Sequence, residues 1–269
     1  DVIITTAAGC TSTSAGIATT VNPLPVASLV SSDADNIICA GTQVTFTAAP
    51  SGAASYDFRV NGVSIGASAT NTYTTSTLTN GDVVDVIVST AAGCSSTSTG
   101  IATTVNPSIT ATISSSDADN TICAGESVTF TALPSGAATY NFRVNGVSVI
   151  SSASDTYTTS ALATGSVVDV IITTAAGCTS TSAGIATTVN PLPVANLVSS
   201  DADNIICAGT SVTFTATPSG ASTYDFKVNG TSVVSPGVNT YTTSTLNNGD
   251  VVSVAITSTS GCVATSAGI

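Results

Sequence analysis

Residues 44–65 read VTFTAAPSGAASYDFRVNGVSI and contain the clearest structural signals in the chain. Apolar side chains alternate with threonine in VTFTA and with charged residues in YDFRV, the period-two pattern of a strand with one buried face. The Asn-Gly pair at residues 61–62 favours a two-residue hairpin turn of type I′. The stretch therefore predicts strands and a hairpin, with Tyr56 and Phe58 in a core and Arg59 on the solvent face beside Asp57.

The same pattern recurs along the chain with a period of 84 residues. Residues 1–42 match residues 169–210 at every position but one, and the three basic residues keep the 84-residue step. Those basic residues are Arg59, Arg143 and Lys227. Two series of cysteines keep it as well: Cys10, Cys94, Cys178 and Cys262, and then Cys39, Cys123 and Cys207. The chain is a tandem array of one repeated unit.

Each repeat contains several short β-branched, Thr-rich segments separated by turns. In residues 24–107 the strands expected from this pattern are 26–30, 37–39, 44–48, 56–60, 63–65, 71–76, 84–88 and 100–105. Short strands with turns every 8–12 residues are typical of an immunoglobulin-like sandwich. We therefore expect an all-β fold of tandem immunoglobulin-like β-sandwich domains with an 84-residue repeat.

The repeat boundaries follow from the position of the Asn-Pro pairs. We expect residues 1–23 to be the C-terminal part of a truncated repeat, 24–107 and 108–191 to be complete repeats, and 192–269 to be a repeat that lacks the end of its last strand. Asp1 corresponds to Asp85, in the middle of a predicted strand, so we expect the chain to be a section of a longer array.

Composition excludes several classes of function. The chain has 3 Lys+Arg against 15 Asp+Glu, a net charge of −12 and no His. Nucleic-acid binding needs cations that neutralise phosphates, and anionic lipid surfaces repel an acidic protein. No stretch reaches the ~20 apolar residues of a membrane span. Catalytic arrangements built on His are impossible, and Lys227 is the only lysine. We expect the protein not to be an enzyme.

Three motifs resemble a known class of domain. They are Asp-Ala-Asp-Asn-x-Ile-Cys-Ala-Gly-x-x-Val-Thr-Phe-Thr-Ala at residues 33–48, Tyr-x-Phe-x-Val-Asn-Gly at 56–62 and Ala-Ala-Gly-Cys at 91–94. Together they resemble the tandem Ig-like or PKD-like repeats of large Bacteroidota cell-surface proteins, among them gliding-associated adhesins and proteins exported by the type IX route. The resemblance covers the whole chain. It implies an extracellular stalk or fibre, with any binding head elsewhere in the protein.

Two functions fit these observations. The first is a structural extracellular repeat protein that forms a rigid surface fibre, filament or adhesin stalk, whose partners are neighbouring repeats and other copies in a fibre. The second is an array of modules that each bind a glycan or surface ligand weakly and act through avidity. Glycan sites usually present aromatic platforms, whereas here the aromatics take inward positions and Trp is absent. The Ser/Thr-rich surface fits plain β-surface composition, O-glycosylation or lateral packing of fibres.

A recurring acidic kink is the one candidate metal site. Ca²⁺ takes six to eight oxygen ligands, and each Asp-Ala-Asp-Asn segment offers several. The alternative is a turn whose Asp side chains accept hydrogen bonds from their own backbone. The candidate calcium ligands are Asp33, Asp35, Asn36, Asp117, Asp119, Asn120, Asp201, Asp203 and Asn204. We expect no other cofactor.

The cysteines predict disulfides, which persist in oxidising, extracellular compartments. In a sandwich of this strand order Cys39 lies near one pole and Cys94 and Cys10 near the other, about 20–25 Å away at ~3.3 Å per residue. A disulfide needs Cα atoms within about 7 Å. Where the bottom of one repeat meets the top of the next, Cys39 would face Cys178.

The cross-repeat scheme pairs Cys39 with Cys178 and Cys123 with Cys262. It leaves Cys10, Cys94 and Cys207 to find partners in neighbouring repeats beyond the sequence. The alternative stays open at this point: immunoglobulin domains ordinarily bridge their own two sheets, which here would join Cys39 to Cys94 within one repeat and enclose 56 residues.

Overall fold

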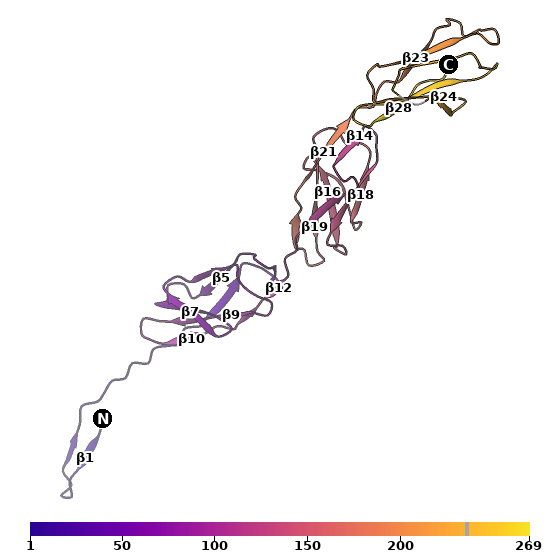
Figure 1. Cartoon of the computed structure of the whole chain (residues 1–269). Helices are drawn as coiled ribbons and strands as arrows, with labels where there is room; N and C mark the ends of the chain where they lie inside the picture. The colour runs from indigo at the N-terminus through magenta and orange to yellow at the C-terminus, as the bar shows by residue number, and fades with distance from the viewer. Residues whose placement is uncertain (235–236) are drawn as a thin grey trace. The chain divides into compact units, whose positions relative to one another are not determined.

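The computed structural model describes residues 1–234 and 237–269, and the fold is all-β (Figure 1). These residues form tandem immunoglobulin-like β-sandwiches. None of their elements is a helix long and apolar enough to cross a bilayer. The chain divides into two compact units. The first contains Asp1–Ser108 together with Ala176–Cys178, and the second contains Ile109–Ala175 and Thr179–Ile269.

The first unit begins with an isolated hairpin and continues into one sandwich. Its strands are β1 (Ile3–Thr5), β2 (Thr11–Thr13), β3 (Ser28–Ser31), β4 (Ile37–Cys39), β5 (Val44–Ala49), β6 (Ser55–Val60), β7 (Val63–Ser68), β8 (Thr72–Thr75), β9 (Val83–Ser89), β10 (Ser95–Thr97), β11 (Ile101–Ala102) and β12 (Thr104–Asn106). One sheet has the order β3-β5-β8 and the other β10-β9-β6-β7, with β11 also paired to β9. Strand β12 pairs in parallel with β4.

The second unit repeats this plan twice. Its strands are β13 (Thr112–Ser115), β14 (Thr121–Cys123), β15 (Val128–Leu133), β16 (Thr139–Val144), β17 (Val147–Ser152), β18 (Thr156–Thr159), β19 (Ser166–Thr173), β20 (Thr179–Thr181), β21 (Ile185–Asn190), β22 (Asn196–Ser199), β23 (Val212–Thr217), β24 (Thr223–Val228), β25 (Thr231–Val234), β26 (Thr240–Thr243), β27 (Val252–Thr257) and β28 (Val263–Thr265). The sheets are β13-β15-β18 and β14-β21-β19-β16-β17, then β22-β23-β26 and β25-β24-β27-β28.

Each sandwich has its own apolar core, built from the inward positions of the alternating strands. In the first sandwich Phe46, Tyr56 and Phe58 are at most 2% exposed. The ring centroid of Tyr73 lies 6.3 Å from that of Phe46 in the same sheet and 5.7 Å from that of Phe58 in the other sheet. Tyr73 therefore packs between the two sheets. Separate clusters of buried residues occur in the other two sandwiches. The repeat boundaries expected from the sequence stay a prediction.

The tyrosine that begins the buried part of β6 also anchors the preceding turn. The hydroxyl of Tyr56 donates to the Pro50 carbonyl oxygen at 2.7 Å and accepts from the Ala53 amide at 3.0 Å. The same two bonds recur around Tyr140 and Tyr224. The polar end of a buried ring is thereby satisfied, as buried hydroxyls require.

The strands differ from the sequence prediction at three points. The first strand of the sandwich is Ser28–Ser31 rather than 26–30, and β10 was not predicted. The expected strand 100–105 is split: β11 pairs with β9, whereas β12 pairs with β4. Gly100 precedes this split, and a Cβ there would lie only 2.6 Å from Cγ1 of Val83. The chain needs a glycine to pass this close to β9.

Candidate functional site

The end of each complete sandwich is closed by a short parallel strand pair that carries a cysteine. In the second unit β21 runs beside β14, with Thr188 opposite Thr121, Val189 opposite Ile122 and Asn190 opposite Cys123. The amide of Ala124 donates to the Asn190 carbonyl oxygen at 2.9 Å, so the pair extends just past the cysteine. This strand pair holds the backbone of Cys123 in place.

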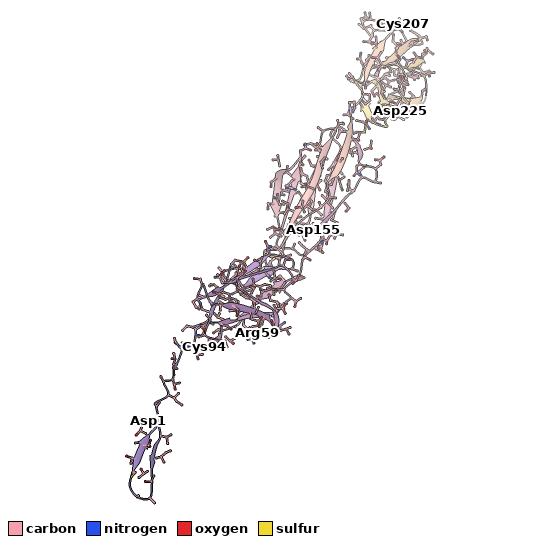
Figure 2. The ribbon with its side chains drawn as sticks, turned by 90° about the vertical axis from the view of Figure 1, so that its left-hand side faces the viewer. Asp1, Arg59, Cys94, Asp155, Cys207 and Asp225 are labelled. Atoms are coloured by element: carbon pink, nitrogen blue, oxygen red, sulfur yellow. A yellow bond between two sulfur atoms is a disulfide. The ribbon has the colours of Figure 1, made fainter. Side chains whose placement is uncertain are left out.

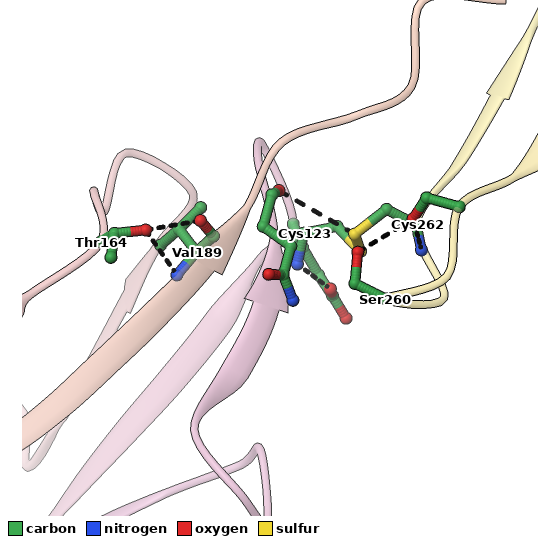
Figure 3. The surroundings of a disulfide bond; sticks show 8 residues. Cys123, Thr164, Val189, Ser260 and Cys262 are labelled. Carbon is green, nitrogen blue, oxygen red and sulfur yellow. Dashed lines mark hydrogen bonds between the residues drawn. A yellow bond between two sulfur atoms is a disulfide. The ribbon is translucent and has the colours of Figure 1, made fainter. Parts of the chain in front are cut away.

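Cys123 is bonded to Cys262, and the two Cα atoms are 5.6 Å apart. Cys262 is fully buried and ends a tight turn, where its amide donates to Oγ of Ser258 at 3.1 Å. Its sulfur also lies 3.9 Å from the carbonyl oxygen of Asn190. Figure 3 shows the two sulfurs meeting beside the end of β21. Within β21 the Val189 carbonyl oxygen accepts from the Thr164 hydroxyl at 2.5 Å, and the Val189 amide donates to the same hydroxyl oxygen at 3.1 Å.

The first unit contains an equivalent bond. Cys39 is bonded to Cys178 with Cα atoms 5.7 Å apart, and Asn106 of β12 lies opposite Cys39. Both disulfides span 139 residues. They therefore connect a cysteine of one sequence repeat with a cysteine of the next, whereas Cys94, the partner of Cys39 in the within-repeat alternative, is free.

Three cysteines are free in the described part of the chain, namely Cys10, Cys94 and Cys207. The sequence assigned these three to partners in neighbouring repeats, and that assignment stays a prediction. Cys94 shares one contact with the bonded Cys262, although it is less buried. Its sulfur lies 3.8 Å from the Asn22 carbonyl oxygen, just as the sulfur of Cys262 lies beside Asn190.

The acidic kinks form turns in which the Asp side chains accept hydrogen bonds from a backbone amide just after the kink. The amide of Ile37 donates to Oδ1 of Asp33 at 3.1 Å and to Oδ1 of Asp35 at 3.0 Å, and Asn36 has a left-handed φ of 57°. The turns before Thr121 and Ile205 repeat these bonds. This geometry is that of a turn whose Asp side chains accept hydrogen bonds from the nearby backbone, which the sequence analysis gave as the alternative to a calcium site. Among the described residues no group of three or more Asp, Glu, Cys or His side chains is placed to hold a metal ion.

The sequence did not identify the main partner of the arginines. Arg59 forms a two-point ion pair with Asp85 on β9, and Asp57, its expected neighbour, contributes less. The hydrogen bond to Asp85 is the largest influence on the guanidinium and raises its pKa further above the usual range. Residues directly opposite each other on adjacent strands lie closer than residues two apart on one strand. Arg59 therefore pairs with the cross-strand carboxylate of Asp85.

The chain was also compared with known proteins. No protein-family model matches it, and no curated protein matches it. Among solved structures it is similar to the fibronectin(III)-like modules of Clostridium thermocellum CbhA, at 15% identity over 61% of this chain and 95% of that chain, with a TM-score of 0.37.

Murine CEACAM1b is similar at 9% identity over 61% of this chain and 100% of that one, with a TM-score of 0.33. The human OSCAR ligand-binding domain is similar at 13% identity over 60% and 98%, with a TM-score of 0.27. The assignment of the fold rests on the sheets and cores described above.

Proposed function

We propose that the chain is a structural, non-enzymatic part of an extracellular fibre or adhesin stalk at a cell surface. The observation that carries the proposal is the pair of disulfides of equal span, Cys39–Cys178 and Cys123–Cys262. Each connects a cysteine of one repeat with a cysteine of the next. Bonds of this kind resist separation of successive domains, which is the requirement of a stalk under tension. Disulfides also favour an oxidising, extracellular location.

The rest of the molecule supports a mechanical role. Its large aromatic side chains pack in the cores. The carboxylates of the acidic kinks accept hydrogen bonds from backbone amides. The chain has no His and only three basic residues. The resemblance of its motifs to Bacteroidota surface repeats supports the same role and a source in that group.

Stretching single molecules by their ends tests this proposal. With both disulfides closed, the taut path runs from the N-terminus to Cys39, from Cys178 back to Cys123, and from Cys262 to the C-terminus. At about 3.4 Å per residue the fully extended length is roughly 350 Å, against roughly 900 Å after reduction. Equal lengths before and after reduction would contradict the cross-linked stalk.

The alternative function, a multivalent glycan-binding array, needs exposed aromatic platforms. Tyr56, Phe58 and their counterparts are buried instead. A glycan array probed with the 269-residue chain separates the two functions. Saturable binding by this segment would favour the binding array, whereas a stalk gives none.

A further inference from the structure

The same two-residue turn joins two neighbouring strands in all three sandwiches, and one of its contacts differs among the copies. Asn61-Gly62 connects β6 to β7, Asn145-Gly146 connects β16 to β17, and Asn229-Gly230 connects β24 to β25. The asparagines have φ values between 51° and 53°, and the glycines between 77° and 78°. Arg59 and Asp225 lie on the strands that lead into the first and third turns (Figure 2). The three turns thus allow a comparison at constant backbone conformation.

The side-chain carbonyl of the asparagine is held in the same way in every copy. Oδ1 of Asn61 accepts from the Val83 amide at 3.0 Å. The corresponding bonds in the second and third turns measure 2.9 and 3.0 Å. A backbone amide in this position stabilises negative charge that develops on the oxygen. The following glycine is open, because a Cβ placed on Gly62, Gly146 or Gly230 would meet no atom within 4 Å. Nothing therefore crowds the glycine beside the carbonyl carbon.

The side-chain nitrogen of the asparagine is held in only two of the three copies. Nδ2 of Asn61 donates to Oδ1 of Asp82 at 2.7 Å. The third turn has the same bond to an aspartate at 2.8 Å. In the second sandwich Ser166 replaces this aspartate. Within the described chain Nδ2 of Asn145 has no hydrogen-bond partner, and Asn145 is exposed. Asn145 is therefore the least restrained of the three asparagines.

We propose that Asn145 is a site of spontaneous deamidation, from which Asp82 and Asp250 protect the corresponding asparagines of the other two sandwiches. The two carboxylates act in two ways. Their hydrogen bond holds the side-chain amide at a second point, which opposes the rotation that brings Cγ onto the glycine nitrogen. Their negative charge also repels the anion that forms as this nitrogen attacks. Asn145 has neither restraint.

The reaction needs only water. The Gly146 nitrogen loses its proton and attacks Cγ of Asn145, so that a C–N bond forms, and Nδ2 takes up the proton and leaves as ammonia. Water then opens the resulting cyclic imide at either carbonyl and yields aspartate or isoaspartate. Isoaspartate lengthens the backbone of a two-residue loop and so disrupts the turn that sets Val144 opposite Val147. Deamidation therefore weakens the second sandwich before the other two. The inference goes beyond the proposed function and does not depend on it.

The test is to incubate the 269-residue chain at mildly alkaline pH and to sequence its peptides by mass spectrometry, which resolves each asparagine. We expect deamidation at Asn145 to run about tenfold faster than at Asn61 or Asn229, the effect of one hydrogen bond and one nearby charge. Two further Asn-Gly pairs, at residues 80–81 and 248–249, lie in a different turn and are scored separately. Equal rates at the three hairpin turns, or no reaction at Asn145, would overturn the inference.

Exchanging the residue beside the asparagine tests the cause. Ser166→Asp supplies the missing carboxylate and should slow deamidation at Asn145 to the rate at Asn61. Asp82→Ser should raise the rate at Asn61 about tenfold. Asp85→Ser is the matched control for lost stability, because the carboxylate of Asp85 lies in the same sandwich but binds an arginine, and it should leave the rate at Asn61 unchanged. An unchanged rate at Asn145 in Ser166→Asp, or equal rises at Asn61 in Asp82→Ser and Asp85→Ser, would contradict protection by the carboxylates.

Discussion

Arg59 and Asp85 lie directly opposite each other on β6 and β9, and they meet at 2.6 Å between Nε and Oδ1 and at 2.9 Å between Nη2 and Oδ2. Arg143 and Asp169 repeat this geometry. In the third sandwich Ser253 replaces the aspartate, and Lys227 lies 3.5 Å from a carboxylate oxygen of Asp225 on its own strand instead.

Removing the cross-strand carboxylate should cost different amounts in the first two sandwiches. Asp85→Ser leaves Asp57 to compensate Arg59, whereas in the second sandwich Asn141 stands at that position. We expect a loss of about 0.5 kcal/mol for Asp85→Ser and about 1 kcal/mol for Asp169→Ser, since these pairs are partly exposed. Denaturant unfolding of both variants checks the order. Equal losses would show that Asp57 does not compensate.

The turn before β6 should depend on a single hydroxyl. Tyr56→Phe removes the bond to the Pro50 carbonyl and leaves the Ala53 amide without its acceptor. We expect a loss of about 1–2 kcal/mol in the free energy of unfolding. Tyr73→Phe is the matched control, because the hydroxyl of Tyr73 makes no hydrogen bond to the described residues. A similar loss in both variants would show that the turn contributes nothing specific.

The acidic kinks should keep their structure without metal. Asn retains the acceptor oxygen that binds the Ile37 amide but removes the charge that calcium needs. We therefore expect Asp33→Asn/Asp35→Asn to melt like the unmodified protein, whether calcium or a chelator is present. Asp33→Ala should cost about 1 kcal/mol. A melting temperature that rises with calcium in the unmodified protein alone would instead support the calcium site.

Acid should weaken the first sandwich partly through Asp82. The Thr79 amide and then the Asn61 side chain donate hydrogen bonds to this carboxylate, which lowers its pKa below the ordinary value of 3.8. A lowered pKa in the folded state means that the stabilisation is complete above the ordinary value and is lost as the pH falls through the folded value.

Ser166 gives the matched substitution, because it stands at the same position in the second sandwich and accepts from the Ala163 amide. We expect Asp82→Ser to be less stable than the unmodified protein at neutral pH, and the difference to shrink as the pH falls below 3.8. Urea unfolding across this range measures it. A difference that does not change with pH would exclude titration of Asp82 as the cause.

The local parts of the fold were predictable from sequence, and the non-local parts were less so. The hairpin at residues 61–62 follows from Asn-Gly alone, and both residues have the positive φ of a type I′ turn. The split between β11 and β12 was not predicted, because a Thr-rich strand has the same sequence pattern whichever neighbouring strand it pairs with. Asp85 was missed as the partner of Arg59 because the register of β6 and β9 depends on residues far apart in sequence.

The candidate site shows the same limit. The spacing of 84 residues and the opposite poles of Cys39 and Cys94 favoured Cys178 as the partner of Cys39 but left pairing with Cys94 open, and the structure has the bond to Cys178. The acidic kinks were ambiguous, since calcium ligands and self-bonded turns use the same side chains.

The two disulfide-closed loops, residues 39–178 and 123–262, overlap, and this makes the covalent molecule tolerant of breaks. Cutting the backbone once between residues 39 and 262 leaves both pieces attached through at least one bridge. The three tryptic sites, after Arg59, Arg143 and Lys227, all lie in this range. Partial trypsin digestion should therefore give singly cut molecules that keep their full mass until reductant separates them. A chain with this redundancy stays in one covalent piece wherever the first cut falls between residues 39 and 262.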